Sequence, residues 1–248
     1  MTNQLKGTLY YLYTNVKFTL LIFWSIIVGI LALSLIASFL MSEGIISFQL
    51  SISVYIFCMI IGGWTVKNAI PYTVKLGSTR KNLYVSLGIY FLGFSLFNSL
   101  IANMLNKFVE VVFDISQVEV VFDGSHVEGF VGISATSDTG SFTFFHLAQF
   151  LESDSWLTFV IVDASICFFI LTTAFIVGLV FYKYGLIGGF SFLGIIMFTI
   201  ILGIAKGWLI DLFINIFKDY SIVFFYQLFA VGLIIYLVSF IFLRRITL

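Results

Sequence analysis

At residues 71–84 the chain reads Pro71-Tyr-Thr-Val-Lys-Leu-Gly-Ser-Thr-Arg-Lys-Asn-Leu-Tyr84, a short polar stretch between two long apolar runs. Apolar runs of about 20 residues are long enough to cross a bilayer, so this stretch is predicted to lie at a membrane surface. It carries Lys75, Arg80 and Lys81. Because loops on the cytosolic side are enriched in Lys and Arg, the stretch predicts the orientation of the whole chain.

The composition is that of an integral membrane protein. Hydrophobic residues make up 61% of the 248 residues and charged residues 10%, whereas roughly a quarter of the residues in soluble domains are charged. The mean hydropathy is +1.14. Because the net charge is zero, nucleic acid is not an expected partner.

Six apolar runs are each long enough to cross a membrane core of about 30 Å, so we predict an all-α protein with six transmembrane helices. The runs are 18–40, 46–66, 84–105, 156–181, 185–205 and 222–243. Residues 18–105 then hold the first three spans and residues 156–248 the last three. In residues 1–17, apolar side chains from Leu5 to Val16 recur at helical spacing, which predicts an interfacial amphipathic helix. A disordered leader is the alternative.

The distribution of charge predicts the topology. An even number of spans puts both termini on one side, and cytosolic termini place most cations inside. The cations inside are Lys6, Lys17, Lys67, Lys75, Arg80, Lys81, Lys183, Arg244 and Arg245. Every acidic residue except Asp163 is then outside. The sequence therefore predicts a multi-pass protein of the plasma membrane.

Residues 106–155 form the one sizeable external segment, between the third and fourth spans. Residues 109–122 and 130–145 are rich in Val, Phe, Ser and Thr with partial alternation, so a small β-containing segment is expected. Residues 141–151 are alternatively a short helix. A second external piece, residues 206–220, is predicted to be an amphipathic helix that dips into the outer leaflet, with an ordinary loop as the alternative.

The fourth and fifth spans are joined by a tight turn at residues 183–185, which predicts an antiparallel hairpin. Two glycine pairs, Gly185/Gly189 and Gly203/Gly207, have the small-xxx-small spacing that lets helices approach closely in lipid. We therefore expect these glycines to lie at helix contacts.

The chain lacks the motifs of common membrane enzymes, so no catalytic residue and no metal site are predicted. It has no His-Glu-x-x-His, no Gly-x-Ser-x-Gly and no phosphate-binding P-loop sequence. Cys58 and Cys167 lack the spacing of metal ligands. No cofactor is expected in this chain, and ATP hydrolysis would have to reside in another protein.

One ionisable residue lies inside a predicted span. Asp163 follows Trp156 by about 10 Å along a helix, and a carboxylate at that depth costs a few kcal/mol unless it is paired or hydrated. Together with Asn98 and Asn103 of the third span, it is a candidate for a polar translocation path. The alternative is a structural residue that is capped by neighbouring hydroxyl groups or reached by external water.

The polar stretch at residues 71–84 predicts a short elbow at the cytosolic surface. Pro71 is expected to end the second span, Gly77 to allow a sharp bend, and Ser78 or Thr79 to cap a new helix. The alternative is a loop whose cations simply contact anionic headgroups.

This order of features resembles the permease subunits of bacterial type-2 ATP-binding-cassette (ABC) exporters. The resemblance rests on six spans, an N-terminal amphipathic helix, Leu-Gly-Ser-Thr-Arg-Lys-Asn at residues 76–82, a tight turn between the fourth and fifth spans, and an external helix before the sixth. It implies that the elbow seats in a groove of a separate cytosolic P-loop ATPase. The residues to which it assigns coupling roles are Lys75, Gly77, Ser78, Thr79, Arg80 and Lys81.

The same resemblance implies the partners and the function. The chain would pair with a second permease copy or a related permease, contact membrane lipid, and bind two copies of the ATPase, which hold ATP and Mg²⁺. It would export a substrate by alternating access, and an amphipathic or hydrophobic peptide is the expected cargo. Two rival hypotheses are a non-transporting sensor or immunity protein for cationic peptides and an ion-coupled transporter that uses Asp163.

Overall fold

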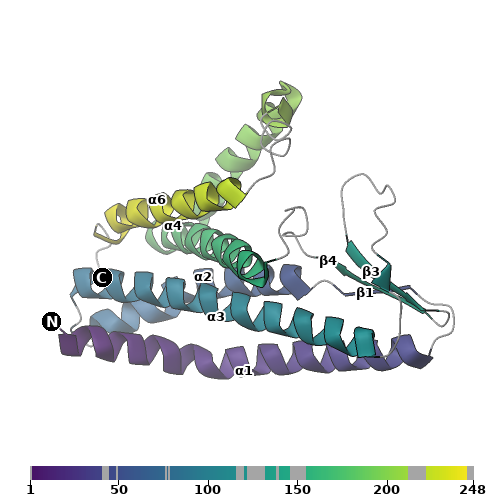
Figure 1. Cartoon of the computed structure of the whole chain (residues 1–248). Helices are drawn as coiled ribbons and strands as arrows, with labels where there is room; N and C mark the ends of the chain where they lie inside the picture. The colour runs from purple at the N-terminus through teal and green to yellow at the C-terminus, as the bar shows by residue number, and fades with distance from the viewer. Residues whose placement is uncertain are drawn as a thin grey trace. The chain divides into compact units, whose positions relative to one another are not determined.

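The computed structural model describes residues 2–40, 45–48, 50–75, 77, 79–115, 120–121, 132–137, 140–145, 155–211 and 222–244. The described helices are α1 (Thr2–Leu40), α2 (Leu50–Lys75), α3 (Arg80–Ile115), α4 (Trp156–Ala205) and α6 (Ile222–Arg244) (Figure 1). The described strands are β1 (Ile45–Phe48), β2 (Val120–Val121), β3 (Gly132–Ser137) and β4 (Gly140–Phe145).

Five of the described helices are long and apolar enough to cross a membrane. Their apolar parts are Gln4–Ser34, Leu50–Thr73, Arg80–Val109, Trp156–Ala205 and Ile222–Leu243. The length and composition of these helices are compatible with a helical, multi-pass membrane protein. The 50 residues of α4 far exceed the roughly 20 that one crossing needs.

The chain divides into two compact units. Unit 1 comprises Met1–Leu9, Phe57–Ser95 and Ser165–Leu248, and unit 2 comprises Tyr10–Ile56 and Leu96–Ala164. The divisions fall within α1, α2, α3 and α4, so each unit is built from helix segments.

The core of unit 1 consists of large apolar side chains that recur every three or four residues along their helices. They include Leu83, Leu87 and Phe91 of α3, Leu171, Phe175 and Leu179 of α4, and Phe225 of α6, all with at most 1% of their surface exposed. The Phe91 and Phe175 rings meet edge to face, with centroids 5.2 Å apart. Edge-to-face packing is a favoured arrangement of aromatic pairs, so these rings help to fix α3 against α4.

Glycines let α2 and α4 approach closely in unit 1. A Cβ at Gly62 would lie 2.6 Å from the carbonyl oxygen of Leu171, and a Cβ at Gly178 would lie 2.9 Å from Cγ2 of Val66. Small residues at helix contacts are typical of membrane bundles, where packing rather than the hydrophobic effect holds helices together.

Two of the four glycines predicted to lie at helix contacts do so, each against the neighbouring helical segment of the chain. A Cβ at Gly189 would clash with the Phe181 ring, across the break at Gly185, and a Cβ at Gly203 would lie 2.8 Å from the Trp208 ring, across the turn at Gly207. Nothing lies within 4 Å of a Cβ built at Gly185 or Gly207, both of which have positive φ. These two glycines therefore form the turns, and Gly189 and Gly203 make room for the segments that the turns join.

Gly185 interrupts α4 where the sequence predicts a tight turn. Its φ of 70° and ψ of −171° are not helical, and its positive φ is one that residues with a Cβ rarely adopt. The Phe181 and Phe190 rings lie 5.6 Å apart, whereas nine residues of unbroken helix would separate their Cα atoms by about 13 Å. The second helical segment therefore leaves the line of the first, which runs beside α6 (Figure 1).

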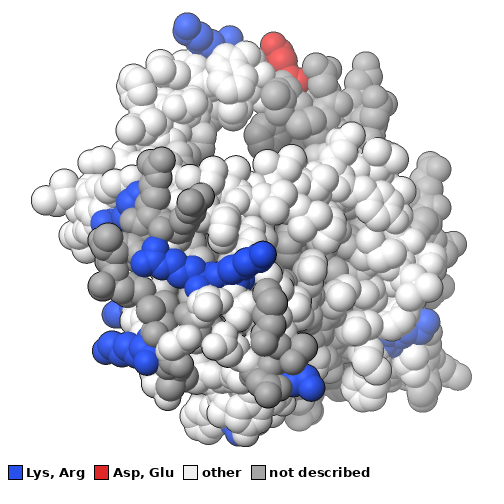
Figure 2. All heavy atoms as spheres, turned by 90° about the vertical axis from the view of Figure 1, so that its left-hand side faces the viewer, with Lys and Arg blue, Asp and Glu red and all other residues white. Residues whose placement is uncertain are grey.

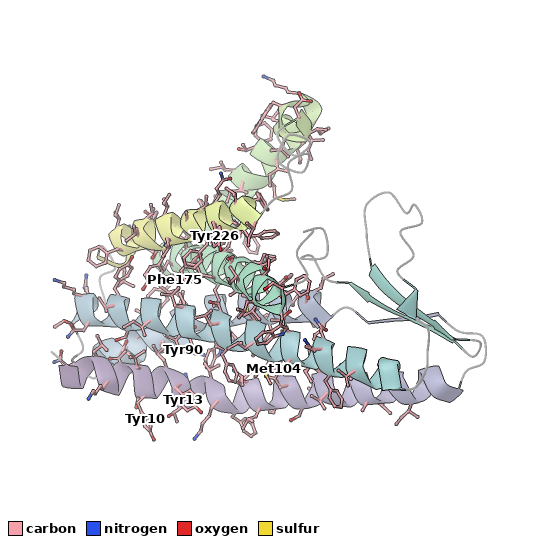
Figure 3. The ribbon with its side chains drawn as sticks, in the orientation of Figure 1. Tyr10, Tyr13, Tyr90, Met104, Phe175 and Tyr226 are labelled. Carbon is pink, nitrogen blue, oxygen red and sulfur yellow. The ribbon has the colours of Figure 1, made fainter. Side chains whose placement is uncertain are left out.

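In unit 2, helix α1 buries one stripe of its surface. The buried side chains are Leu12, Val16, Trp24, Ile27 and Leu31. Tyr10 and Tyr13 point away from the unit and are 72% and 64% exposed (Figure 3). The sequence predicts a separate interfacial helix that ends near residue 17, but α1 is continuous from Thr2 to Leu40. The buried stripe keeps its helical spacing through the predicted boundary, so nothing in the packing favours a break there.

The described strands form a sheet in unit 2, with the order β1-β4-β3-β2. Strand β1 pairs parallel to β4, and β3 pairs antiparallel to both β4 and β2. Both β3 and β4 fall within residues 130–145, for which the alternation predicts strands. Of the alternative helix at 141–151, residues 141–145 lie in β4, and the rest is outside the described residues.

Residues 109–115 are helical and not part of a strand, contrary to the prediction for 109–122. Helix α3 continues to Ile115, because Val109, with 0% of its surface exposed, extends the buried face of the helix seven residues beyond Ala102. Strand β2 begins only at Val120.

Part of the predicted external helix at 206–220 is described. The chain turns at Gly207, which has φ 77°, and a helical turn begins at Trp208. The N–H of Asp211 donates to the carbonyl of Gly207 at 2.9 Å. Residues 212–220 lie outside the described residues.

Candidate functional site

The elbow in unit 1 joins α2 to α3 within four residues. Gly77 has φ 76°, which allows the bend that the sequence predicts. The carbonyl of Thr79 accepts a hydrogen bond from the N–H of Leu83 at 2.9 Å, and its hydroxyl oxygen accepts one from the N–H of Asn82 at 3.3 Å. These contacts are those of an N-cap residue. The cap therefore falls on Thr79, and Ser78 lies outside the described residues.

Pro71 does not end α2, contrary to the prediction. The helix contains Pro71 and continues to Lys75. Just after the proline, the Thr73 hydroxyl donates to the carbonyls of Ala69 at 2.6 Å and Ile70 at 3.2 Å. Threonine hydroxyls near a proline are among the groups with which membrane helices accommodate it. The carbonyl that loses its helical N–H donor at Pro71 is that of Lys67.

A side-chain hydrogen bond ties the start of α3 to the N-terminal residues of α1. Nδ2 of Asn82 donates to Oε1 of Gln4 at 2.8 Å, and Asn82 is only 5% exposed. One turn later the Ser86 hydroxyl donates to the carbonyl of Asn82 at 2.8 Å. The first turn of α3 is thus held from the side as well as capped at its end.

Two tyrosines join α3 to α6 just beyond the elbow, by hydrogen bonds and by stacking of their rings. The Tyr84 hydroxyl donates to the backbone carbonyl of Tyr236 at 2.9 Å, and the Tyr236 hydroxyl donates to the backbone carbonyl of Tyr84. Their rings are stacked with centroids 4.5 Å apart. Gly88 makes room for this pair, because a Cβ there would lie 3.0 Å from Cε1 of Tyr236. Nothing in the local sequence marks this contact, which joins positions 152 residues apart.

Three exposed cations, Lys75, Arg80 and Lys81, belong to the stretch of the elbow. Unit 1 also exposes Lys6 and Lys67, and Lys183 is half-buried. In Figure 2, Lys and Arg side chains are spread over the face of the molecule that is shown, and the visible acidic atoms lie at its upper edge. Such a face can bind an acidic protein surface or anionic headgroups.

The second candidate site, in unit 2, is a polar network around Asp163. This side chain is 2% exposed. The Tyr55 hydroxyl donates to Oδ1 of Asp163 at 2.6 Å, and Nδ2 of Asn103 donates to Oδ2 at 2.8 Å. Both carboxylate oxygens therefore accept hydrogen bonds, one from α2 and one from α3.

Further hydrogen bonds extend this network along α3. Nδ2 of Asn103 also donates to the carbonyl of Ser99 at 2.9 Å, and the Ser99 hydroxyl donates to the carbonyl of Val160 in α4 at 2.6 Å. Asn98 is fully buried in the same helix. The geometry joins Asn103 to Asp163 as the sequence suggests and adds Tyr55, which the sequence analysis missed. A carboxylate held by two donors fits the structural alternative, in which neighbouring groups cap it.

Among the described residues, no group of three or more His, Cys, Asp or Glu side chains lies close enough together to hold a metal ion. Cys58 and Cys167 are both free and buried in unit 1.

Comparisons of the chain with protein-family models, curated proteins and solved structures gave no match. The likeness to ABC permeases therefore rests on this chain's own residues, above all the elbow and the order of the apolar helices.

Proposed function

We propose that this chain is the transmembrane permease subunit of an ATP-driven ABC exporter and that a separate cytosolic ATPase drives it through the elbow. The observation that carries the proposal is the elbow itself, a short connection that is capped by Thr79 and tied to Gln4 through Asn82. A rigid connection passes a displacement on to the helices, whereas a loose loop would absorb it.

In this proposal α4 crosses the membrane twice. The segments before and after Gly185 each contain about 20 residues or more, which is enough for one crossing. Five helices then give six spans, with both termini and the elbow in the cytosol. Lys206 and Asp211 lie outside, and the β-containing segment at 106–155 faces the exterior.

Because the elbow carries exposed cations, we expect the ATPase to bind it through a groove lined with acidic residues. Lys75, Arg80 and Lys81 are all exposed there, and complementary charge across an interface increases both association rate and specificity. A second permease copy or a related permease completes the transporter. Two copies of the ATPase hold ATP and Mg²⁺, and the cargo is an amphipathic or hydrophobic peptide.

The network around Asp163 has a structural role in this proposal. An ion-coupled transporter would need this carboxylate to exchange a cation during transport, whereas here both of its oxygens accept hydrogen bonds from Tyr55 and Asn103. Those bonds favour the exporter over the ion-coupled alternative. The sensor hypothesis requires no ATPase and is separated from the exporter by the experiment below.

Co-purification tests the proposal. The tagged chain is extracted from its native host in mild detergent, and the proteins that accompany it are identified. We expect a stoichiometric P-loop ATPase with the natural chain and a loss of about tenfold or more in an Arg80→Glu, Lys81→Glu double variant, because reversed charges at an interface repel. Lys206→Glu is the matched control, since Lys206 is exposed but far along the chain from the elbow.

Two results would contradict the proposal. Recovery of the natural chain alone, under conditions that keep other membrane complexes intact, would favour the sensor hypothesis. Equal ATPase recovery with the double variant would remove the elbow as the docking site. A thermal melt of each purified variant shows whether a lost partner reflects a lost fold.

A further inference from the structure

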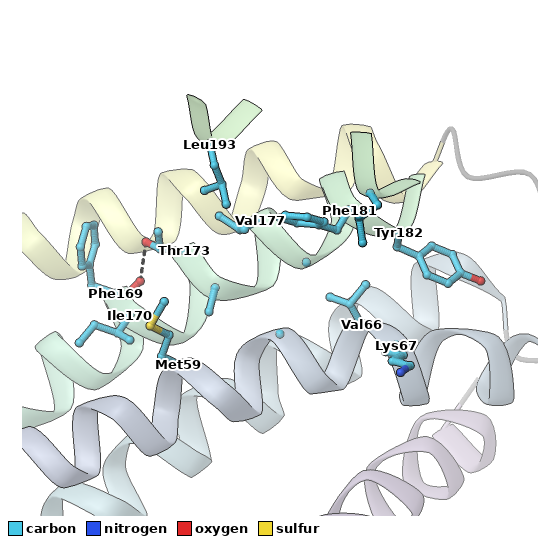
Figure 4. A pocket seen from close by; sticks show the side chains of 14 residues that line it. Met59, Val66, Lys67, Phe169, Ile170, Thr173, Val177, Phe181, Tyr182 and Leu193 are labelled. Atoms are coloured by element: carbon cyan, nitrogen blue, oxygen red, sulfur yellow. Dashed lines mark hydrogen bonds between the residues drawn. The ribbon is translucent and has the colours of Figure 1, made fainter. Parts of the chain in front are cut away.

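A groove of about 800 Å³ lies between α2 and α4 in unit 1 (Figure 4). Met59 and Val66 of α2 line one wall, and Ile170 and Val177 of α4 line the other. Leu193, from the segment beyond the break at Gly185, also lines it. The volume falls within the range of about 300–1,000 Å³ that is typical of small-molecule sites.

Gly63 and the break in α4 leave the space open. Gly63 lines the groove, and a Cβ built there meets nothing within 4 Å. Gly178 also lines the groove, at the point where α4 comes close to Val66 of α2. The turn at Gly185 brings Leu186 and Leu193 to the same groove as residues of the first segment. The cavity is thus formed by the fold of unit 1 itself.

The groove is apolar along its length and cationic at one end. At the other end, the Thr173 hydroxyl donates to the carbonyl of Phe169 at 2.8 Å, so this group is already bonded within α4 (Figure 4). Of the described lining residues, Lys67 alone is charged, and it shares one end of the groove with Tyr182. Both side chains are exposed.

The spacing along α2 gives the length of the apolar part. Met59 and Lys67 are eight residues apart, which corresponds to about 12 Å along a helix. A ligand that fits has an apolar tail to follow this path and an anionic group at its end. A phospholipid has this pattern, and the bilayer presents it directly to a membrane helix.

We propose that this groove binds an anionic phospholipid, with an acyl chain along the apolar walls and the phosphate beside Lys67. A neutral lipid would gain the same apolar contact, but an anionic headgroup adds attraction to the Lys67 ammonium group. Basic positions at the ends of membrane helices recognise anionic headgroups in this way. The proposal requires no ATPase partner and so stands apart from the transport function.

Native mass spectrometry tests the site. The full-length protein is purified in detergent and incubated with equal amounts of phosphatidylglycerol and phosphatidylcholine, and the fraction of protein that carries each lipid is measured. We expect a preference for phosphatidylglycerol that falls about fivefold in Lys67→Gln, because one cation near the headgroup is lost. Lys67→Arg should keep the preference.

Two further variants complete the test. Lys206→Gln is the matched control for surface charge, since Lys206 is exposed and does not line the groove, and it should leave the preference unchanged. Gly63→Leu, which places a side chain in the open space, should lower retention of both lipids. Equal retention of the two lipids by the natural protein would overturn the proposal. So would an equal fall in Lys67→Gln and Lys206→Gln, or retention of both lipids unchanged in Gly63→Leu.

Discussion

The two units hold their helices together with different polar contacts. In unit 2 a single buried carboxylate, Asp163, accepts hydrogen bonds from Tyr55 and Asn103 on two other helices. In unit 1, Tyr84 and Tyr236 each donate to the other's backbone carbonyl and also stack their rings. The first contact depends on one carboxyl group, whereas the second is divided between two hydroxyl groups.

The difference shows in what remains after one side chain is removed. Without the carboxylate of Asp163, two buried donors lose an acceptor, and an unsatisfied buried group costs its full desolvation free energy. Without one phenol hydroxyl, the ring stack and the other hydrogen bond of the tyrosine pair remain. The network in unit 2 should therefore be the more sensitive of the two to a single substitution.

The largest effect is expected for Asp163→Ala. It leaves Tyr55 and Asn103 without their shared acceptor, so the free energy of unfolding should fall by about 3 kcal/mol. Asp163→Asn is the matched control, because an amide oxygen can still accept from Asn103 and its NH₂ group can donate to the Tyr55 hydroxyl. SDS titration of the purified protein in detergent measures both. Equal stability of the alanine variant and the natural protein would show that the network does not hold the helices.

An intermediate effect is expected for Gly62→Ala, which tests a contact in unit 1 that uses no polar side chain. The new Cβ would lie 2.6 Å from the Leu171 carbonyl oxygen, so α2 and α4 must separate, at a cost of about 2 kcal/mol. Gly63→Ala, one position along, has open space for its Cβ and should change little in the same titration. Two variants of equal stability would exclude close helix approach as a source of stability here.

The smallest effect is expected for Tyr236→Phe. It removes one hydroxyl but keeps the stacked ring, so the free energy of unfolding should fall by about 1 kcal/mol. Tyr226→Phe on the same helix is the control, because Tyr226 is 50% exposed and its hydroxyl should contribute less. If Tyr236→Phe lowers the free energy of unfolding as much as Asp163→Ala does, the two units are equally sensitive to the loss of one polar group, contrary to the comparison above.

The sequence predicted the apolar helices better than their ends. Hydropathy measures the preference of a segment for lipid and not its helicity, so it did not indicate that the helix predicted at residues 1–17 continues unbroken into the first span or that α3 reaches Ile115. Local rules succeeded at turns, where the chemistry lies within a few residues. Gly77 has the positive φ and Thr79 forms the cap that the pattern of residues 71–84 suggests.

The candidate sites were harder to predict because they join distant positions. Asp163 and Asn103 could be predicted from the sequence, because burying a polar side chain inside a bilayer is unfavourable in free energy. The structure brings them together. Nothing in the local sequence marked Tyr55, which is 108 residues from its partner Asp163. A tyrosine in an apolar run is equally typical of a membrane interface, so its role depends on packing that the pattern does not contain.

The one proline of the chain distinguishes the two helices that meet at the elbow. Pro71 has no N–H, so α2 lacks the backbone hydrogen bond that this residue would otherwise donate to the carbonyl of Lys67. Helix α3 contains no proline, and its first turn is anchored through Asn82. In the exporter proposed above, a displacement of the elbow would therefore be transmitted mainly by α3, because α2 bends more easily at Pro71.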